Sequence, residues 1–416
     1  MTAEPKKRLA KNTLYLYILS LSSQVISLLT IPYQTRVLSP ETYGVIGFFT
    51  GIMAVVALCL NFGFLYSATE QVALNSENNK KISELYTATW VAKFVIFGIL
   101  VLASIVLVFV FDVVRENLAL FVLFFLANAT ASFMPDFLYR GLEQMRTITI
   151  RAVAIRLLSA SMIFIFLKSE QDVLIIPGSL LLGNILALAY CIYYDKTKLA
   201  VSFVPITWAS VRKSLSRGAP FFVSRIASTV YQSGSAIVLG AMYPGQPQVG
   251  LYNASDKLLT AVKQVSSPIA DSIYPYMVKN KDYRLAIKLM LIAAPFIAAC
   301  AVIGFLFADE LAIFVFGEDY REAGNIIKCL IPAMAVIFPT YIICFPILVP
   351  MRLSKFANIS NVIGMTSQLV ILVLLFAADN LNVFTVCLGA SFSEVLVFFF
   401  RLIVMIKYRD RMKRDL

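Results

Sequence analysis

Runs of about 20 mostly apolar residues recur along the whole chain, and they constrain the fold more than any other feature. A helix of that length can cross roughly 30 Å of hydrocarbon. Hydrophobic residues make up 59% of the 416 positions and charged residues only 14%. A water-soluble fold cannot bury so large an apolar excess, because its surface must still be covered by polar atoms. The sequence therefore predicts an all-α integral membrane protein.

Twelve such runs can be counted, and short connections join them. The predicted spans are residues 14–33, 43–65, 85–111, 118–138, 148–167, 173–194, 218–242, 251–278, 285–308, 326–348, 356–377 and 383–406. We expect two lobes of six helices each. The predicted boundaries are residues 1–195 for the N-terminal lobe, 196–217 for a cytoplasmic linker and 218–416 for the C-terminal lobe.

The predicted spans place most of the basic residues on one side of the membrane. Of 36 Lys and Arg residues, 25 fall in the termini and even-numbered connections, Arg140, Arg146 and Arg151 among them, and only four fall in the odd-numbered connections. Cytoplasmic loops carry such an excess of Lys and Arg, so we expect both termini in the cytoplasm. The bias accounts for most of the net charge of +12, and no nucleic-acid partner is needed to explain that charge.

The chain also resembles itself at half its length. The segment RVLSPETYG ends at Gly44 and AMYPGQPQVG ends at Gly250, 206 positions later. Arg146 and Arg352 precede their spans at the same offset, and FVFD returns as FVFG 205 positions on. Three matches near one offset indicate duplication of a six-span unit. Because six is even, both copies start from the same side, which predicts a pseudo-two-fold axis along the membrane normal.

Seven basic residues remain at membrane depth. They are Lys93, Arg156, Arg225, Lys257, Lys263, Lys328 and Arg401, against the carboxylates Asp136, Asp256, Asp271 and Glu394. A charge at the bilayer centre costs on the order of 2.5–3.5 kcal/mol, so such residues face a partner or a water-filled cavity. Internal salt bridges are one explanation for them. The surplus of cations favours the other explanation, a polar cavity that receives an anion.

Residues 251–278 carry the clearest polar pattern. Polar positions that step by 4, 3, 4, 4 and 3 fall on one face of a helix, and that face cannot lie against lipid. This stripe consists of Asp256, Thr260, Lys263, Ser267, Asp271 and Tyr274. A shorter version in residues 218–242 consists of Arg225, Thr229 and Gln232.

Spacing also predicts individual pairings. Asp136 lies one helical turn from Arg140, which predicts a structural pair. Glu394 and Arg401 share a helix face but are seven residues apart, about 10 Å by helical rise, and that is too far for a tight ion pair. Lys328 lies one turn from the end of its span, and we expect its long side chain to reach the interface.

Prolines interrupt several spans, and residues 326–348 contain three of them. Pro332, Pro339 and Pro346 follow one another at intervals of seven. Each removes a backbone hydrogen bond and kinks its helix. We therefore expect this span to be an element that bends during a transport cycle.

Three blocks of sequence resemble a known family. They are IPYQTRVLSPETYGVIGFFTGI at residues 31–52, VGLYNASDKLLTAVKQVSSPIADSIYPYM at 249–277 and FGEDYREAGNIIKCLIPAM at 316–334. They resemble the Wzx-type polysaccharide flippases of the multidrug/oligosaccharidyl-lipid/polysaccharide (MOP) exporter superfamily. The resemblance implies twelve helices in two lobes and alternating access. It also implies transport of an undecaprenyl-diphosphate-linked O-antigen or related sugar unit across the bacterial inner membrane, with a polysaccharide polymerase and a chain-length regulator as partners besides membrane lipids.

A lipid-linked diphosphate sugar suits the residues found at membrane depth. Basic groups can hold the diphosphate, and Arg is suited to bidentate phosphate contact. The candidates for the anion are Arg225, Lys257, Lys263 and Arg156, followed by Lys93 and Arg401. The candidates for sugar hydroxyls are Gln24, Gln232, Asn253 and Tyr274. Asp256, Asp271 and Glu394 are candidates for H⁺ or Na⁺ coupling, with fixed counter-ions as the equal alternative.

Four other functions compete with this one. A MATE-type drug antiporter for cations would need a net acidic membrane interior, whereas this one is net basic. A lipid-linked peptidoglycan precursor flippase fits the charge but usually has additional spans. A membrane-embedded polymerase or ligase would need a sizeable outer loop with catalytic groups, and a purely structural scaffold would not need buried charges. The chain has no His, and its six Cys show no CxxC spacing, so no cofactor or metal is expected.

Overall fold

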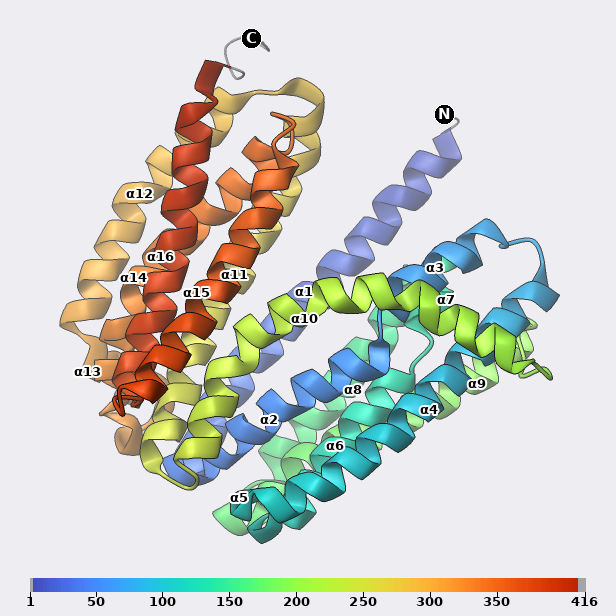
Figure 1. The fold of residues 1–416 in the computed structure, drawn as a ribbon, viewed down its shortest axis with the longest axis horizontal. Helices are drawn as coiled ribbons and strands as arrows, with labels where there is room; N and C mark the ends of the chain where they lie inside the picture. The colour runs from blue at the N-terminus through green and yellow to red at the C-terminus, as the bar shows by residue number, and fades with distance from the viewer. Residues whose placement is uncertain (1–2, 411–416) are drawn as a thin grey trace. The chain divides into compact units, whose positions relative to one another are not determined.

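The computed structural model describes residues 3–410, and within that range the backbone forms helices and no strand (Figure 1). It leaves undescribed the side chains of residues 3–11, 13, 16, 224, 227–228, 230–232, 275–276 and 279–280. The predicted all-α fold class is confirmed.

Each predicted span of the first half is mainly helical, and the second one crosses a break at Phe62 and Gly63. The elements of this half are α1 (Ala3–Val37), α2 (Pro40–Asn61), α3 (Phe64–Leu74), α4 (Asn79–Val110), α5 (Asp112–Glu116), α6 (Leu118–Phe133), α7 (Asp136–Gly141), α8 (Met145–Phe166), η1 (Glu170–Leu174) and α9 (Ile175–Lys198). The fourth predicted span is divided between α6 and α7. Pro135 stands between these two helices, and because a proline lacks the N–H that a helix interior requires, the break occurs there.

The second half is also helical at each predicted span. Its elements are α10 (Trp208–Met242), α11 (Pro247–Asn280), α12 (Tyr283–Leu306), α13 (Ala308–Phe316), η2 (Glu318–Tyr320), α14 (Ala323–Ile342), η3 (Ile343–Leu348), α15 (Ser354–Ala377) and α16 (Val383–Lys407). Pro332 and Pro339 lie inside α14, and Pro346 lies in η3, which is a π-helix. The tenth predicted span thus changes from α-helix to π-helix in the stretch that contains its last proline.

Many of these helices are built to cross a membrane. Among the described residues, nine stretches are long and apolar enough to span hydrocarbon: Pro40–Leu74, Asn79–Val110, Leu118–Gly141, Met145–Phe166, Glu170–Lys198, Tyr283–Leu306, Ala323–Leu348, Ser354–Ala377 and Val383–Lys407. The other three predicted spans lie in α1, α10 and α11. The protein is a multi-pass membrane protein.

The chain forms two compact units and passes between them at three points, two of which lie inside a continuous helix. One unit comprises residues 1–38 and 48–229, and the other comprises residues 39–47 and 230–416. The first border falls between α1 and α2, the second inside α2 and the third inside α10. The predicted lobe boundaries, at residues 195 and 218, stay a prediction.

The first unit is held together by aromatic packing. Tyr86 and Trp90 on α4 lie against Phe133 and Phe137, with ring centroids 5.4 Å apart for Trp90 and Phe133 and 6.3 Å apart for Tyr86 and Phe137. Farther along the unit, α1 packs on α8, α8 on α9 and α9 on α6. At the contact of α8 with α9, a Cβ on Gly183 would lie 3.1 Å from the Cγ2 of Ile155. The absence of a side chain at this position lets the two helices approach closely.

The second unit is built around α14, which packs against α11, α12 and α16. Ile342, Ile343 and Ile347, at the end of α14 and in the π-helix, belong to its buried apolar cluster, together with Met277 of α11. The winding change therefore lies inside the packed core of the unit.

The beginning of α2 belongs to the second unit through contacts with α11. A Cβ on Gly250 would lie 1.7 Å from the carbonyl oxygen of Pro40, and a Cβ on Gly44 would lie 3.0 Å from the backbone nitrogen of Gly250. A Cβ on Gly47 would overlap the amide of Asn253, which itself donates a hydrogen bond to the Gly44 carbonyl at 3.4 Å. Two blocks that are distinctive in the sequence, 31–52 and 249–277, thus meet at a contact that only glycine permits.

We expect Gly250→Ala to destabilise the protein, because the new methyl group would meet a backbone atom that cannot rotate away. Overpacking of this kind costs about 1–3 kcal/mol. The measurement is thermal unfolding of the purified protein in detergent. Gly98→Ala is the matched control, because Gly98 is also helical and has nothing within 4 Å of an added Cβ. Equal melting temperatures for the two variants would contradict the prediction.

Candidate functional site

A polar cavity of about 320 Å³ lies within the first unit. Helices α2, α4, α6, α7 and α10 all contribute to its wall. Its charged and amide-bearing lining residues are Asn61, Lys93, Asn128, Asp136 and Arg225. We call it the Lys93–Arg225 cavity. Two of the cations selected from the sequence thus border the same space.

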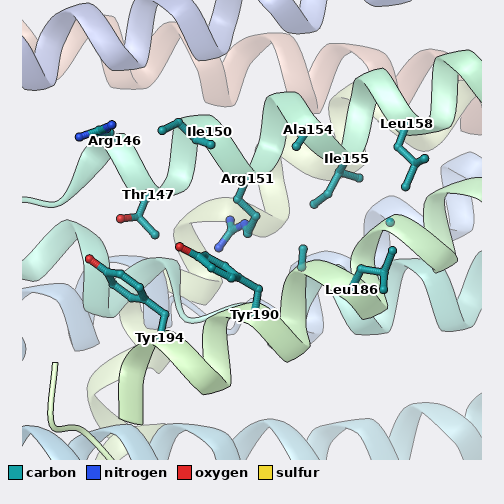
Figure 2. A pocket seen from close by; sticks show the side chains of 12 residues that line it. Arg146, Thr147, Ile150, Arg151, Ala154, Ile155, Leu158, Leu186, Tyr190 and Tyr194 are labelled. Atoms are coloured by element: carbon teal, nitrogen blue, oxygen red, sulfur yellow. The ribbon is translucent and has the colours of Figure 1, made fainter. Parts of the chain in front are cut away.

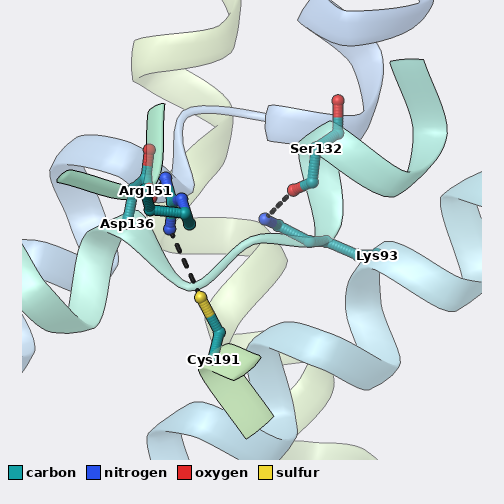
Figure 3. A network of polar contacts seen from close by, with 5 residues as sticks. All are labelled: Lys93, Ser132, Asp136, Arg151 and Cys191. Carbon is teal, nitrogen blue, oxygen red and sulfur yellow. Dashed lines mark hydrogen bonds and ion pairs between the residues drawn. The ribbon is translucent and has the colours of Figure 1, made fainter. Parts of the chain in front are cut away.

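Lys93 is fixed at the back of this cavity by a helix break. Its side chain is 2% exposed, and its Nζ donates a hydrogen bond to the carbonyl oxygen of Ser132 (Figure 3). That carbonyl lies in the last turn of α6, where carbonyls lack their usual helical donors because α6 ends at Phe133. The ammonium also lies 5.9 Å from the centre of the Phe137 ring, a distance at which the ring face attracts a cation.

Arg225 is the exposed partner of Lys93 in the cavity. It extends from α10, and its guanidinium carbon lies 5.9 Å from the centre of the Tyr66 ring. The same arginine borders a second cavity of about 130 Å³, formed by α2, α3 and α10. A long cation that borders two cavities is well placed to contact a ligand.

Asp136 is the carboxylate of the Lys93–Arg225 cavity, and its charge is already neutralised. The Nη2 of Arg151 donates to its Oδ1 at 2.5 Å, and the same guanidinium reaches Cys191 Sγ at 3.5 Å (Figure 3). The expected pairing of Asp136 with Arg140 is wrong. α7 and α8 are separate helices, so their turn brings Arg151 to Asp136 instead. With that carboxylate occupied, Lys93 and Arg225 leave the cavity net basic.

The remaining candidates of the first unit lie elsewhere. Arg156 of α8 donates to the carbonyl of Leu19 in α1 at 3.3 Å. Gln24 donates to Ser20 on its own helix at 3.3 Å. Neither of them borders the Lys93–Arg225 cavity. Gln232 belongs to the second unit, and its side chain lies outside the described residues.

The polar stripe of α11 lies largely inside the second unit. Five of its six members are half-buried and Asp271 is exposed, whereas Val265 and Ile269, on the opposite face of the helix, are exposed. Lys263 forms an ion pair with Glu394 of α16 at 2.7 Å, with side chains 26% and 12% exposed. Ser267 donates to Asp271 at 3.2 Å. The stripe is therefore a charged face that is partly neutralised from α16.

Four other candidates share the second unit. Asp256 and Lys257 are half-buried neighbours on α11, and the Tyr274 ring meets the Phe345 ring edge-on at 6.4 Å. Asn253 is 5% exposed, and its amide is used by the Gly44 contact described above. Of this group, Asn253 has a clear structural role.

Arg401 is the most completely satisfied cation of the predicted set. It is 6% exposed, and its guanidinium donates to Ser360 Oγ at 2.8 Å, to the Thr340 carbonyl at 3.1 Å and to Asn361 Oδ1 at 2.7 Å. Glu394 and Arg401 do not pair with one another in the second unit, in line with their spacing. Lys328 pairs with Asp309, in the first turn of α13, at 3.3 Å, and its reach to the interface stays a prediction.

Sequence reasoning missed two features of the site. Asn61 and Asn128 line the cavity, and an amide inside an apolar run was the signal that could have identified them. Arg151 is 7% exposed although it was counted with the cytoplasmic loop residues. Among the described residues, no group of three His, Cys, Asp or Glu side chains is placed to hold a metal ion.

Known proteins resemble this chain in sequence and in fold. The sequence profile of a family described as "Polysaccharide biosynthesis protein" matches residues 9–281. A protein of Escherichia coli (strain K12) that is named as an O-antigen transporter is 28% identical over 65% of each chain. One of Shigella dysenteriae with the same name is 24% identical over 94% of this chain and 98% of its own length.

Solved structures share the fold at low sequence identity. The lipid II flippase MurJ in an inward closed conformation has a TM-score of 0.72 at 16% identity and covers 97% of this chain and 90% of its own. An inward-facing MATE-family multidrug transporter of the MOP superfamily has a TM-score of 0.68 at 13% identity, over 94% of this chain and 95% of its own. With the family profile covering more than half of its residues, the chain belongs to the polysaccharide biosynthesis protein family, and its fold is that of the MOP superfamily.

Proposed function

We propose that the protein is a flippase that moves undecaprenyl-diphosphate-linked oligosaccharide units across the bacterial inner membrane by alternating access. The units would build O-antigen or a related surface polysaccharide. The net basic Lys93–Arg225 cavity carries this proposal, because a polar, positively charged space inside an apolar bundle calls for an anionic ligand. The two relatives named as O-antigen transporters support the substrate class.

Lys93 and Arg225 would each bind the diphosphate in a different way. Lys93 is buried and oriented by Ser132, so it offers a fixed positive charge. Arg225 is exposed and can close on the ligand with two parallel hydrogen bonds. Asn61 and Asn128 add amide groups to the same wall, and amides donate to and accept from sugar hydroxyls. The volume of about 320 Å³ corresponds to about ten water molecules at roughly 30 Å³ each.

The second unit would supply the coupling groups. Asp256, Asp271 and Glu394 are the proposed carboxylates for H⁺ or Na⁺. Glu394 is the one with a cation partner, Lys263 at 2.7 Å. Binding of H⁺ or Na⁺ at Glu394 would weaken its ion pair with Lys263, which would link the coupling ion to a proposed anion contact. Lys257 and Lys263 accordingly remain proposed anion contacts of this unit.

The competing functions fit these residues less well. Lys93 and Arg225 would repel a cationic drug. The fold shared with MATE transporters therefore does not imply that this protein transports the same substrates. The relatives are named as transporters and not as polymerases or ligases, which supports transport without bond cleavage. We further propose cytoplasmic termini, and a polysaccharide polymerase and a chain-length regulator as functional partners.

Removal of either cavity cation should stop transport without unfolding the protein. A hydrogen bond to a charged group contributes about 1.5–3 kcal/mol, so Arg225→Gln and Lys93→Met should each weaken substrate binding roughly 10- to 100-fold. The measurement is surface polysaccharide display in a strain that lacks its own flippase, with protein amounts checked by immunoblot. Arg212→Gln, an exposed position on the same helix, is the control. Full display by Arg225→Gln would refute the assignment.

Arg401 should behave differently, because its donors are used inside the protein. Arg401→Gln leaves buried acceptors without their donor, at about 1–3 kcal/mol for each unsatisfied group. We expect a lower melting temperature and less protein in the membrane, but normal transport per folded molecule. Transport lost at unchanged melting temperature would show instead that Arg401 contacts the substrate.

Coupling can be tested in proteoliposomes that contain the purified protein and a lipid-linked diphosphate sugar. We expect transport to fall when the pH and sodium gradients are both abolished, and Glu394→Gln to lose this dependence because an amide does not titrate. Glu310→Gln, an exposed carboxylate at the start of α13, should retain it. Transport that is unchanged without either gradient would reject the coupling role of all three carboxylates.

A further inference from the structure

A second, larger cavity lies in the first unit, on the surface where α8 runs beside α9 (Figure 2). Its volume is about 540 Å³. It shares no lining residue with the Lys93–Arg225 cavity, and the proposed transport function makes no use of it. We call it the α8–α9 groove.

The groove is polar at one end and apolar at the other. Arg146, Thr147 and the hydroxyls of Tyr190 and Tyr194 lie at the end where α8 begins, and Leu158 lies at the opposite end (Figure 2). Twelve helical steps separate Arg146 from Leu158, which corresponds to roughly 18 Å. An amphipathic molecule with a long chain matches this arrangement.

Small side chains create the hollow between the two helices. Ala154 on α8, and Gly183 and Ala187 on α9, line the groove. Each of them takes less room than the leucines and isoleucines that fill most of these helices, so the space above them stays open. The hollow is therefore set by the sequence of both helices.

The walls of the groove are the kind of surface that contacts hydrocarbon. Ile150 is 54% exposed and Leu186 is 56% exposed, and both line the groove. Neighbouring Leu157 and Ile185 are exposed at 53% and 49%. Because these residues lie in helices that span the membrane, the occupant reaches the groove from the lipid phase and not from water.

The charge at the polar end is a cation without a carboxylate. Arg146 is exposed, and no described residue forms an ion pair or hydrogen bond with it. The other guanidinium of the groove, Arg151, is neutralised by Asp136 at 2.5 Å. Tyr190 stacks on Tyr194 with ring centroids 5.8 Å apart and keeps its own side chain 52% exposed. The polar end thus offers one unneutralised positive charge beside a tyrosine hydroxyl.

The N-terminus of α8 adds to this end. The N-cap residue Gln144 makes no side-chain cap, so the first N–H groups of α8 lack that partner. Free N–H groups and the helix dipole both favour a negative charge at a helix start. They act in the same direction as Arg146, which lies in that first turn.

We propose that the α8–α9 groove binds an anionic phospholipid from the leaflet in which α8 begins. The phosphate lies at Arg146 and the Tyr190 hydroxyl, and one acyl chain runs along Ile150, Ala154 and Leu158. The groove length of roughly 18 Å suits a single acyl chain. The undecaprenyl chain of the transported lipid is several times longer than the groove.

Native mass spectrometry of the full-length protein tests this site. Detergent-purified protein is titrated with dioleoylphosphatidylglycerol and, separately, with dioleoylphosphatidylcholine. We expect one phosphatidylglycerol to bind at least tenfold more tightly than phosphatidylcholine. Arg146→Gln should lose this preference, and Arg212→Gln, an exposed arginine of α10, should keep it.

A second variant tests the groove itself rather than the charge. Ala154→Phe fills the hollow while leaving Arg146 in place, and should weaken phosphatidylglycerol binding by a similar factor. If Ala154→Phe does not fold, Ala154→Val gives a smaller loss in the same direction. Binding that survives both the charge and the filling variants would overturn the proposal.

A third titration distinguishes the source of the phosphate. Undecaprenyl diphosphate is offered to the wild-type protein and to Arg146→Gln. The proposal expects phosphatidylglycerol, and not undecaprenyl diphosphate, to depend on Arg146. If binding of undecaprenyl diphosphate, and not of phosphatidylglycerol, depends on Arg146, the groove belongs to the carrier lipid and the phospholipid proposal is overturned. Because the readout is lipid binding and not transport, its outcome is independent of the proposed flippase activity.

Discussion

Hydrocarbon offers no partner to a buried charge, so the protein itself must satisfy each cation that it places at membrane depth. Lys93 is satisfied by a carbonyl, Arg151 by Asp136, Lys263 by Glu394 and Arg401 by three neutral acceptors. How each cation is satisfied decides what else it can do. Arg401 has its guanidinium occupied on several sides, whereas Lys93 has one carbonyl and an open cavity beside it.

Interruptions of the helices supply part of these acceptors. The helix breaks at Pro135, between α6 and α7. This break leaves the Ser132 carbonyl available to Lys93 and places Asp136 at the start of α7. The Thr340 carbonyl that binds Arg401 lies just before the π-helix that contains Pro346. In both units, therefore, a buried cation binds a carbonyl that lies close to a proline-interrupted stretch of helix.

Much of the fold could be predicted from the sequence, because span length is a direct consequence of membrane thickness. Each predicted run is mainly helical, and the glycines that end two corresponding motifs, Gly44 and Gly250, prove to be in contact. Pairing between helices could not be read in the same way. Asp136 was assigned to Arg140, one turn away, but it binds Arg151 on the next helix, because the turn between α7 and α8 sets which side chains meet.

The sequence selected the cations that line the cavity by their residue type, but it did not group them correctly. Lys93 and Arg225 were both selected as cations at membrane depth, but Arg225 was grouped with Lys263, and the structure shows that it shares a cavity with Lys93. The α8–α9 groove gave no signal in the sequence, because Ala154, Gly183 and Ala187 count as ordinary apolar residues when each helix is considered alone. A hollow forms only where small residues of two neighbouring helices lie side by side. The sequence of each helix alone does not show which residues of the other helix lie beside it.

The two units arrange their charges in different ways. In the first unit the carboxylate near the cavity is paired with Arg151, and the other charged residues of the cavity lining are the cations Lys93 and Arg225. In the second unit Lys263, a proposed anion contact, is paired directly with Glu394, a proposed coupling carboxylate. We infer that the first unit supplies the main site for the anion, and that in the second unit anion contact and coupling act through one ion pair.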